Sequence, residues 1–455
     1  MKTGTARDAR ELSILILIEI ITKEGFANLV IDSFLTESKL NKVERSFVTQ
    51  LVYGVMRHYN TLEWILAHFI REKISKLKPV MRIILLTGIY QIVYLTKIPD
   101  SAACNEAANL ARKYGHQGVV AFVNGVLRNV ARQKDNLPYP DAEERPEDHI
   151  AIKYSHPEWL VARWLDRYGF AETVKLCRKN NEPAKIWLRC NTLKMTAADL
   201  EQKLADEGIT TSRSKYAPEG VGIQGFDTIS KLPGYEEGLF QVQDESSMVV
   251  GHVVKPSPGA KVIDACSGPG GKTTHLAQLM SNEGIIKAFD IYEHKLKLIT
   301  DNYTRLGVTI VETQLGDATL LYKNLTDWAD YLLVDAPCSG TGVLGRRADS
   351  RWRKSPEQLT ELAELQASIL TAASRCVKPG GILVYSTCSM EPEENQQVIE
   401  GFLAKNCNFI PQNLVPLLPF EVDVEDQDNA TKGYFQFLPQ RHGTDGFFVA
   451  RMKRI

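Results

Sequence analysis

The spacing of apolar and polar residues divides the chain into regions of different predicted structure. In residues 1–134 the apolar positions recur at helical intervals, which predicts helices at Leu12–Ile21, Phe47–Met56, Leu62–Ile70, Val80–Tyr94, Ala102–Leu110 and Gly118–Asn129. Residues 135–149 hold three prolines and six acidic residues, a composition typical of a linker. The pattern therefore predicts an all-helical N-terminal domain over residues 1–134 and a linker over residues 135–149.

Residues 150–238 mix helical and strand patterns. Helical spacing recurs at Trp159–Tyr168, Ala171–Lys179 and Ala197–Glu207, whereas Ile186–Cys190 has the composition of a strand. Glycines then punctuate the stretch from Ser212 to Gly238, which is typical of short strands and turns. We predict a small α+β domain over residues 150–238.

From residue 239 to residue 455, strand and helix patterns alternate. The predicted strands are Lys261–Asp264, Ile285–Asp290, Val308–Thr313, Tyr331–Asp335, Ile382–Ser386 and Gly446–Arg451. The predicted helices are Lys272–Met280, His294–Leu306, Pro356–Val377 and Glu393–Ala404. Alternation of this kind predicts an α/β domain with a mainly parallel sheet covered on both faces. The acidic stretch Glu421–Asp428 is expected to be an exposed loop.

Composition and cysteine usage narrow the class of protein. A chain of 455 residues is expected to hold more than one domain. Its apolar runs fall short of the ~20 residues that span a bilayer, and the start, MKTGTARDAR, carries an acid and lacks an apolar signal segment. We therefore expect a cytoplasmic protein without membrane contact. The eight cysteines form no CxxC pair, which predicts reduced thiols and no metal site.

Charge is distributed unevenly, although the net charge is only −1. Residues 1–134 hold 19 Lys and Arg against 11 Asp and Glu, or +8, while residues 135–150 hold one Arg against six acids, or −5. A basic N-terminal domain is compatible with RNA binding, and equally with a solvated charged surface.

A glycine-rich turn follows the first predicted strand of the α/β domain. The strand ends at Asp264, and the amides of the next helix would face an anion or carboxylate. Cys266 stands where a Walker A loop needs its first glycine, and Thr273 stands where the dinucleotide fingerprint needs its last. With those two motifs excluded, the turn predicts a nucleoside-type cofactor held by Cys266, Ser267, Gly268, Pro269, Gly270, Gly271 and Lys272.

Acidic residues stand at the ends of successive predicted strands. They are Asp264, Asp290, Asp317 and Asp335. An acid that ends the second strand is well placed to bind ribose hydroxyls, so Asp290 is assigned that role. Asp317 would then contact the base of the cofactor. Each acid alone would more commonly be a helix cap, and their shared position at strand ends favours a binding site.

Two of the cysteines also follow predicted strands. Cys338 comes after Asp335-Ala-Pro, and Cys388 lies among Ser386, Thr387 and Ser389. A thiolate at a strand end is stabilised by backbone amides or a cationic neighbour and can act as a nucleophile. The spacing of the residues leaves open which of the two thiols is the nucleophile.

The chain resembles the S-adenosylmethionine-dependent RNA 5-methylcytosine methyltransferases in five segments: DACSGPGGKT (264–273), FD (289–290), GDA (316–318), DAPCSGTG (335–342) and STCS (386–389). Residues 44–57 and 122–128 resemble NusB-like RNA-binding domains, and the combination resembles the RsmB (Sun/Fmu) branch of that family. The chain departs from the branch at Ser267-Gly268, where two alanines are usual, which bears on cofactor affinity.

The resemblance implies a Rossmann-like catalytic domain, a NusB-like domain and a role for each site residue. Cys388 would add to C6 of the target cytosine, and Cys338 would assist release when the C5 proton leaves. Asp335 would bind the cytosine edge around N3. The cofactor would be S-adenosylmethionine, lined by Cys266–Lys272, Asp290, Asp317 and Asp335. The substrate would be 16S ribosomal RNA with a single-stranded or flipped-out cytosine, bound by a monomeric enzyme.

Basic residues supply the candidate RNA contacts. Arg346, Arg347, Arg351 and Arg353 follow the Cys338 loop, while Arg189 and Lys194 match the pattern of the branch. Trp352 would either stack on a base or lie in the core.

Two other functions are weighed against this one. The same chemistry could act on transfer RNA, or the chain could be a non-catalytic RNA-binding assembly factor, although such a factor would need neither thiol. An exocyclic-amine methyltransferase would carry a Pro-Pro-aromatic turn where Ala336-Pro337-Cys338 stands.

Overall fold

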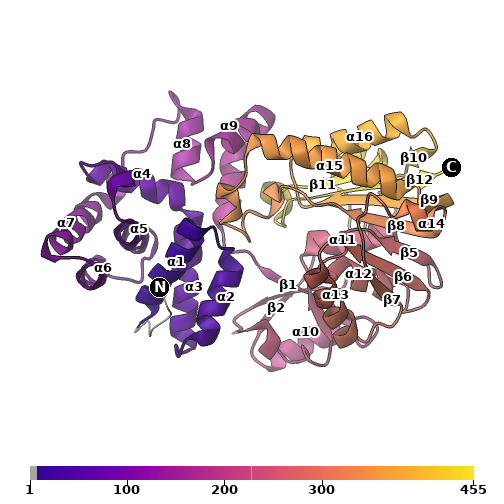
Figure 1. Cartoon of the computed structure of the whole chain (residues 1–455), viewed down its shortest axis with the longest axis horizontal. Helices are drawn as coiled ribbons and strands as arrows, with labels where there is room; N and C mark the ends of the chain where they lie inside the picture. The colour runs from indigo at the N-terminus through magenta and orange to yellow at the C-terminus, as the bar shows by residue number, and fades with distance from the viewer. Residues whose placement is uncertain (1–7, 227) are drawn as a thin grey trace. The chain divides into compact units, whose positions relative to one another are not determined.

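The computed structural model describes residues 8–226 and 228–455. The chain forms two compact units (Figure 1). The helical unit contains the chain as far as Glu182 together with Leu344–Arg353, and the sheet unit contains Pro183–Val343 and Lys354–Ile455. Within the described part of the chain, no helix combines the length and the hydropathy needed to cross a membrane.

The helical unit is built around one helix that is buried on nearly all sides. This helix, α5 (Pro79–Tyr94), packs among α1 (Ala9–Lys23), α3 (Lys42–Arg57), α4 (Tyr59–Phe69), α6 (Asp100–Tyr114) and α7 (Gln117–Gln133). All six predicted helices of this region are present. A further helix, α2 (Ala27–Glu37), was not predicted, because it buries only Ala27, Ile31 and Leu35 and so has a weak apolar pattern.

Two more helices belong to the helical unit by their contacts. They are α8 (Pro146–Lys153), which begins inside the predicted linker, and α9 (Glu158–Asn181). Gly169 has a φ of 75° and interrupts α9, which explains why the sequence pattern predicts two helices there. The predicted boundary at residue 150, between the linker and the small α+β domain, placed α9 in the small α+β domain instead.

A segment from much later in the chain, Leu344–Arg353, is part of the helical unit. Ala348 is buried in the core of the unit, and Asp349 Oδ2 accepts a hydrogen bond of 3.2 Å from the Ala27 amide at the start of α2. Trp352 Nε1 donates to the carbonyl oxygen of Met56 over 2.9 Å. We call this stretch the strap, since it returns the chain to the helical unit between two parts of the sheet unit.

The sheet unit contains a small antiparallel sheet of four strands in the order β2-β3-β1-β4. The strands are β1 (Ile186–Cys190), β2 (Thr210–Arg213), β3 (Gly220–Gln224) and β4 (Phe240–Val242). Helix α10 (Ala197–Asp206) packs Leu200 and Leu204 against Leu188, Val221 and Phe240 of this sheet. This sheet and helix form the small α+β element that the sequence predicts.

The larger sheet has the order β10-β12-β9-β8-β5-β6-β7, with β11 (Tyr434–Phe437) paired to β12. Its parallel strands are β5 (Lys261–Asp264), β6 (Ile285–Asp290), β7 (Val311–Leu315), β8 (Ala329–Asp335) and β9 (Val377–Thr387). Two antiparallel strands, β12 (Phe447–Arg454) and β10 (Phe409–Pro411), extend the β9 side. The predicted mainly parallel, Rossmann-like sheet is confirmed.

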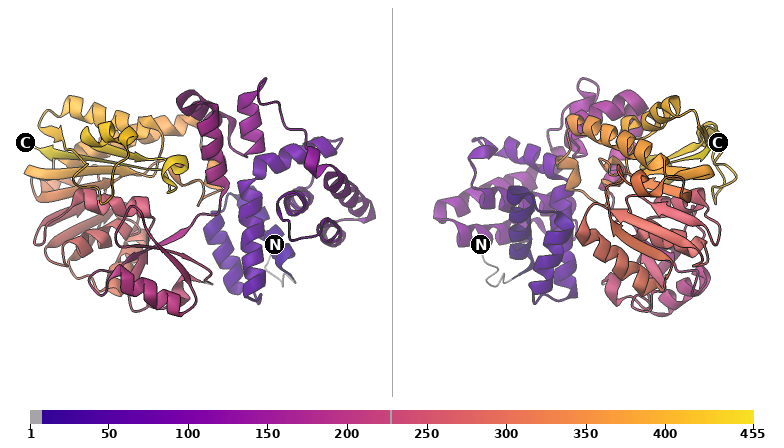
Figure 2. Two further views of the ribbon diagram at one scale, coloured as in Figure 1. Left: turned by 180° about the vertical axis from the view of Figure 1, so that it is seen from behind. Right: turned by 45° about the vertical axis from the view of Figure 1, so that its right-hand side comes forward.

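Helices cover both faces of the larger sheet (Figures 1 and 2). One face carries α11 (Glu245–Val254), α12 (Gly271–Leu279) and α13 (Glu293–Leu306), and the other carries α15 (Pro356–Ser374) and α16 (Gln396–Lys405). Successive strand residues alternate between the two cores, with Leu332 on one side and Leu333 on the other, as a period of two requires. The prediction of an exposed loop at Glu421–Asp428 is wrong in part, because helix α17 (Val424–Thr431) begins within that stretch.

Candidate active site

The candidate site lies at the carboxyl ends of the parallel strands. Asp264 ends β5, Asp290 ends β6 and Asp335 ends β8, while Ser386 is the β9 partner of Asp335. The chain passes from β5 to β6 and β7 on one side of β5 and then returns to β8 and β9 on the other side, so the order of the sheet reverses between β5 and β8. In open α/β sheets this reversal leaves a crevice in which ligands bind.

The two cysteine loops meet at this edge of the sheet. The Sγ atoms of Cys338 and Cys388 lie 3.3 Å apart, and the amide of Gly342 donates to the carbonyl oxygen of Cys388 over 3.0 Å. The neighbouring Cys388 and burial together raise the pKa of the Cys338 thiol well above its usual value. Cys338 therefore keeps its proton at neutral pH.

A buried carboxylate, Glu394, joins the two cysteine loops and was not predicted as a site residue. Its side chain is 0% exposed. Oε1 accepts from the Ser339 amide at 2.7 Å and from Gln366 Nε2 at 3.0 Å, and Oε2 accepts from the hydroxyls of Ser339 and Ser389. Because Ser339 follows Cys338 and Ser389 follows Cys388, this one side chain fixes both loops. The sequence signal was an acid six residues after Cys388, which the pattern assigned to the start of a helix.

Asp335 is held on both of its oxygen atoms. Oδ1 accepts from the Ser386 hydroxyl at 2.7 Å, and Oδ2 is 2.8 Å from Lys272 Nζ. Lys272 also lies 5.0 Å from the ring centroid of Phe447, a cation–π distance. The ion pair connects the glycine-rich turn to the end of the strand that leads into the Cys338 loop.

The glycine-rich turn is shaped by its contacts with β6. The amide and hydroxyl of Ser267 both donate to the carbonyl oxygen of Phe289, at 2.7 and 2.8 Å. The Gly268 amide donates to Asp290 Oδ2 over 3.0 Å, and a Cβ atom at residue 268 would lie 2.5 Å from that same oxygen. Glycine at this position thus allows the carboxylate of Asp290 to reach the backbone of the turn.

The other two predicted cofactor acids have local partners. Asp290 also accepts from the Tyr292 amide at 3.0 Å and lies 3.5 Å from Lys295 Nζ. Asp317 accepts from the amide and the hydroxyl of Thr319 at 2.8 and 2.7 Å. Their contacts with the ribose and the base of a cofactor remain predictions.

Asp264 is one of the strand-end acids that the sequence marked, although no part of the cofactor was assigned to it. It is fully buried, Oδ2 accepts from the Thr273 hydroxyl at 2.7 Å, and Oδ1 has no hydrogen-bond partner among the described residues. Burial, with the charge of Asp335 nearby, raises the pKa of Asp264 to about 7. A buried acceptor without a donor fits a ligand that brings one, such as the ammonium or ribose hydroxyls of S-adenosylmethionine.

Two of the predicted RNA contacts are wrong, because the side chains are internal. Arg189 is 1% exposed and donates to Thr274 Oγ1 at 2.9 Å and to Gln278 Oε1 at 3.2 Å, both on α12. Arg351 is also 1% exposed and donates to the carbonyl oxygens of Ser155 and Asn180 at 2.8 and 3.1 Å. Each guanidinium group therefore supports the fold and presents no face to RNA.

The remaining basic candidates differ in exposure. Arg347 and Lys194 are exposed, while Arg346 and Arg353 are half-buried. Arg353 donates to the carbonyl oxygen of Gly25. Trp352 packs against the core of the helical unit, which favours the core alternative over base stacking. RNA contact by Arg346, Arg347, Arg353 and Lys194 remains a prediction.

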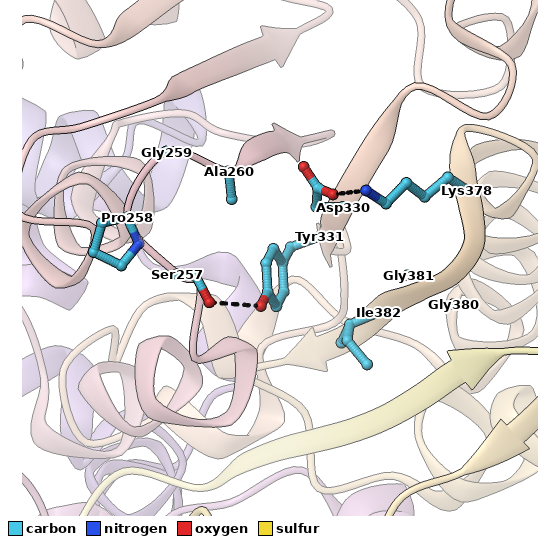
Figure 3. Close-up of a pocket in the computed structure, with 10 residues that line it drawn as sticks. All are labelled: Ser257, Pro258, Gly259, Ala260, Asp330, Tyr331, Lys378, Gly380, Gly381 and Ile382. Atoms are coloured by element: carbon cyan, nitrogen blue, oxygen red, sulfur yellow. Dashed lines mark hydrogen bonds and ion pairs between the residues drawn. The ribbon is translucent and has the colours of Figure 1, made fainter.

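A separate cavity of about 350 Å³ opens at the amino ends of β5 and β8 (Figure 3). Its wall carries the Asp330–Lys378 ion pair and a contact of 3.2 Å between the hydroxyls of Ser257 and Tyr331. This is the opposite edge of the sheet from the cysteine loops, so the cavity is not part of the candidate active site.

Three segments match known families. Residues 251–453 match 16S rRNA methyltransferase RsmB/F, residues 7–132 match the NusB family, and residues 156–229 match the ferredoxin-like domain of RsmF/B-like methyltransferases. A Bacillus subtilis (strain 168) protein named probable ribosomal RNA small subunit methyltransferase B is 39% identical over 98% of both chains. A Klebsiella pneumoniae protein named ribosomal RNA small subunit methyltransferase B is 33% identical over 91% of both.

Solved structures share the fold. The crystal structure of PH0851 has a TM-score of 0.79 at 28% identity and covers 97% of each chain. The structure of NSun6 from Pyrococcus horikoshii with SFG, an analogue of S-adenosylmethionine, has a TM-score of 0.59 at 25% identity. It covers 66% of this chain and 98% of that chain.

Proposed function

Because the chain belongs to the RsmB/F family of S-adenosylmethionine-dependent methyltransferases, we propose that it methylates C5 of a cytosine in 16S ribosomal RNA through a covalent bond between Cys388 and C6 of the base. The observation that carries this proposal is the pair of sulfur atoms 3.3 Å apart at the strand ends. The names of the relatives favour ribosomal RNA over transfer RNA as the substrate.

The chemistry follows from the weakness of cytosine C5 as a nucleophile. Addition of the Cys388 thiolate to C6 places electron density on C5 and splits one difficult step into easier ones. When bound, S-adenosylmethionine supplies an electrophilic methyl group. Asp335, fixed by Ser386 and Lys272, holds the cytosine edge around N3 while charge moves on the ring.

Release requires that the C5 proton leave and the bond between Cys388 and C6 break. Cys338 carries its proton beside the Cys388 sulfur. It gives that proton to Cys388 as the bond to C6 breaks, and the resulting Cys338 thiolate takes the C5 proton. The electron pair of the C5–H bond restores the 5,6 double bond, and the pair of the S–C6 bond stays on sulfur. Cys338 therefore ends with the proton from C5, and Cys388 ends with the proton that Cys338 gave it.

The cofactor site is assigned to the glycine-rich turn and the strand-end acids. Asp264 Oδ1, which has no donor within the described residues, and Asp290 beside Gly268 are the acceptors for polar groups of the cofactor. The Lys272–Asp335 ion pair places the turn beside the residue that holds the cytosine. The Lys272–Asp335 ion pair thus takes part in both the cofactor site and the cytosine site.

Single cysteine variants of the full chain test the proposal. Cys388→Ala should abolish methylation, Cys338→Ala should accumulate a denaturant-resistant RNA–protein adduct, and the exposed Cys407→Ala should match the native chain. Methylation is measured as 5-methylcytosine by mass spectrometry of nuclease-digested 16S RNA, and the adduct by gel shift under denaturing conditions. Wild-type methylation by Cys388→Ala would overturn the assignment of the nucleophile.

A further inference from the structure

A second cluster of chemically reactive side chains lies within the sheet unit, away from the cysteine pair and the cofactor turn in the chain. Glu219 directly precedes β3 of the small sheet, His252 lies on α11 and His275 lies on α12. Their carboxylate and imidazole atoms all lie within 4.8 Å of one another. Three separate elements therefore bring one acid and two histidines to a single point.

The distances within this cluster fit metal ligands. His252 Nε2 is 3.0 and 3.1 Å from the two oxygens of Glu219, and His275 Nε2 is 2.9 Å from Glu219 Oε1. Tetrahedral zinc with bonds of about 2.0–2.1 Å places its ligand atoms ~3.3 Å apart. Shifts of a few tenths of an ångström would therefore admit an ion between the three side chains.

His275 supplies the second, independent observation. Its side chain is 1% exposed, Nε2 forms an ion-pair contact of 2.9 Å with Glu219 Oε1, and Nδ1 has no hydrogen-bond partner among the described residues. The Nδ1 side of the ring is closed by Gly251, where an added Cβ would lie 2.5 Å from that nitrogen. Nε2 is therefore the ring nitrogen that is open to a ligand, and it faces the Glu219 carboxylate.

We propose that Glu219, His252 and His275 bind a zinc ion that ties the small sheet to α11 and α12. Two imidazoles and one carboxylate are a ligand set that zinc accepts and that magnesium and calcium do not favour. His252 is 17% exposed on its side chain, so solvent can supply a fourth ligand. The site is structural: α12 begins at the cofactor turn, and the ion fixes that helix against the small domain.

The chain contains a matched control cluster. Asp423, Asp426 and His442 also bring ligand atoms within 4.8 Å. There, however, Arg441 Nη2 lies 2.9 Å from Asp426 Oδ2 and 2.8 Å from Glu425, so an internal cation already neutralises the acids. This cluster is expected to bind no zinc.

The test uses the full chain without a polyhistidine tag, purified without chelators and given zinc alone. We expect one zinc ion per chain by elemental analysis in the native protein and in His442→Gln, and none in His252→Gln. The melting temperature should rise with zinc for the first two proteins only. A native chain that binds no zinc, or zinc retained by His252→Gln, would overturn the proposal.

A second measurement covers the case in which His252→Gln fails to fold. Native protein is stripped with a chelator and then titrated with zinc while X-ray absorption reports the ligands. Two imidazole nitrogens and one carboxylate oxygen on the bound zinc would support the site. Thiolate ligands, or no recovery of melting temperature on adding zinc, would refute it. Neither measurement depends on RNA methylation.

Discussion

Replacing Glu394 with glutamine should slow methyl transfer while leaving the fold intact. The native carboxylate accepts four hydrogen bonds, from the amide and hydroxyl of Ser339, the hydroxyl of Ser389 and the amide of Gln366. Glutamine has nearly the same shape, so it keeps an oxygen toward the Ser339 amide and Gln366. Its NH₂ group instead faces the two hydroxyls, which must turn to accept from it.

The expected size of the effect follows from these four bonds. Bonds to an ionised group contribute about 1.5–3 kcal/mol, and bonds between neutral groups about 0.5–1.5 kcal/mol. Each bond loses about 1–1.5 kcal/mol when its acceptor becomes neutral, so loss of the charge weakens the four-bond clamp by about 4–6 kcal/mol in total. Part of this loss falls on the alignment of Cys338 and Cys388, and a misplacement of about 1 Å costs ~100-fold in rate. We expect kcat to fall about 10- to 100-fold, with the KM for S-adenosylmethionine little changed.

Two assays separate positioning from general damage. The first is steady-state methylation of 16S RNA. The second needs no RNA: a mild thiol oxidant should link Cys338 to Cys388 rapidly in the native chain, because the sulfurs are 3.3 Å apart. Disulfide formation should be slower in Glu394→Gln and slowest in Glu394→Ala. The control is Glu400→Gln, an exposed acid on α16 that accepts only from Gln396 at 2.7 Å among the bonds found there.

Native kcat and native disulfide rate in Glu394→Ala would refute the clamp. Equal losses in Glu394→Gln and Glu400→Gln would also refute it, since they would show that any loss of an acid in this part of the chain has the same effect. A reduced disulfide rate with unchanged methylation would separate the clamp from the proposed chemistry of the thiols.

Three further predictions follow from other buried or exposed charges. Burial raises the pKa of Asp264 from 3.8 to about 7, so the folded state holds the proton to a higher pH than the unfolded chain does. Stability therefore falls as pH rises from about 4 through 7. Asp264→Asn removes a penalty of up to about 4 kcal/mol, and urea unfolding should show its advantage over the native chain growing between pH 5 and pH 8. Lys73→Glu, Lys76→Glu and Lys78→Glu, all exposed, should together weaken RNA binding and reduce the salt slope by about one per lost phosphate contact, measured by filter binding at several salt concentrations. Arg351→Met should destabilise the helical unit by about 3–5 kcal/mol in denaturant unfolding, because buried carbonyl oxygens lose their donor.

Local pattern was enough to predict most of the fold. The strand Lys261–Asp264 was predicted with its observed bounds, since a strand buried on both faces is a continuous apolar run between turn residues. Patterns failed where burial depends on distant partners. Helix α2 buries few residues, and β7 begins at Val311 rather than Val308 because its burial is interrupted by exposed positions.

The same distinction applies to the site. The motifs identified Asp335 and the two cysteines because an acid or a thiol at the end of a predicted strand can be recognised from the sequence alone. Arg189 and Glu394 were not recognisable, because a charged residue is exposed by default and its burial requires partners far along the chain. Arg189 donates to Gln278, 89 residues away. The spacing of residues along the sequence cannot predict a contact between side chains so far apart in the chain.

The strap changes how an RNA-binding role for the N-terminal region must be tested. The basic charge of residues 1–134 invites a truncation, with loss of RNA affinity as the readout. In the structure, however, Asp349 and Trp352 of the strap bond to Ala27 and Met56, which that truncation removes. Leu344, where the strap begins, follows Cys338 by six residues, so a truncated chain would lose the contacts that hold the strap as well as the basic residues of the N-terminal region. Charge reversal at exposed lysines leaves the strap bonded, and for this reason only surface variants can assign RNA binding to the helical unit.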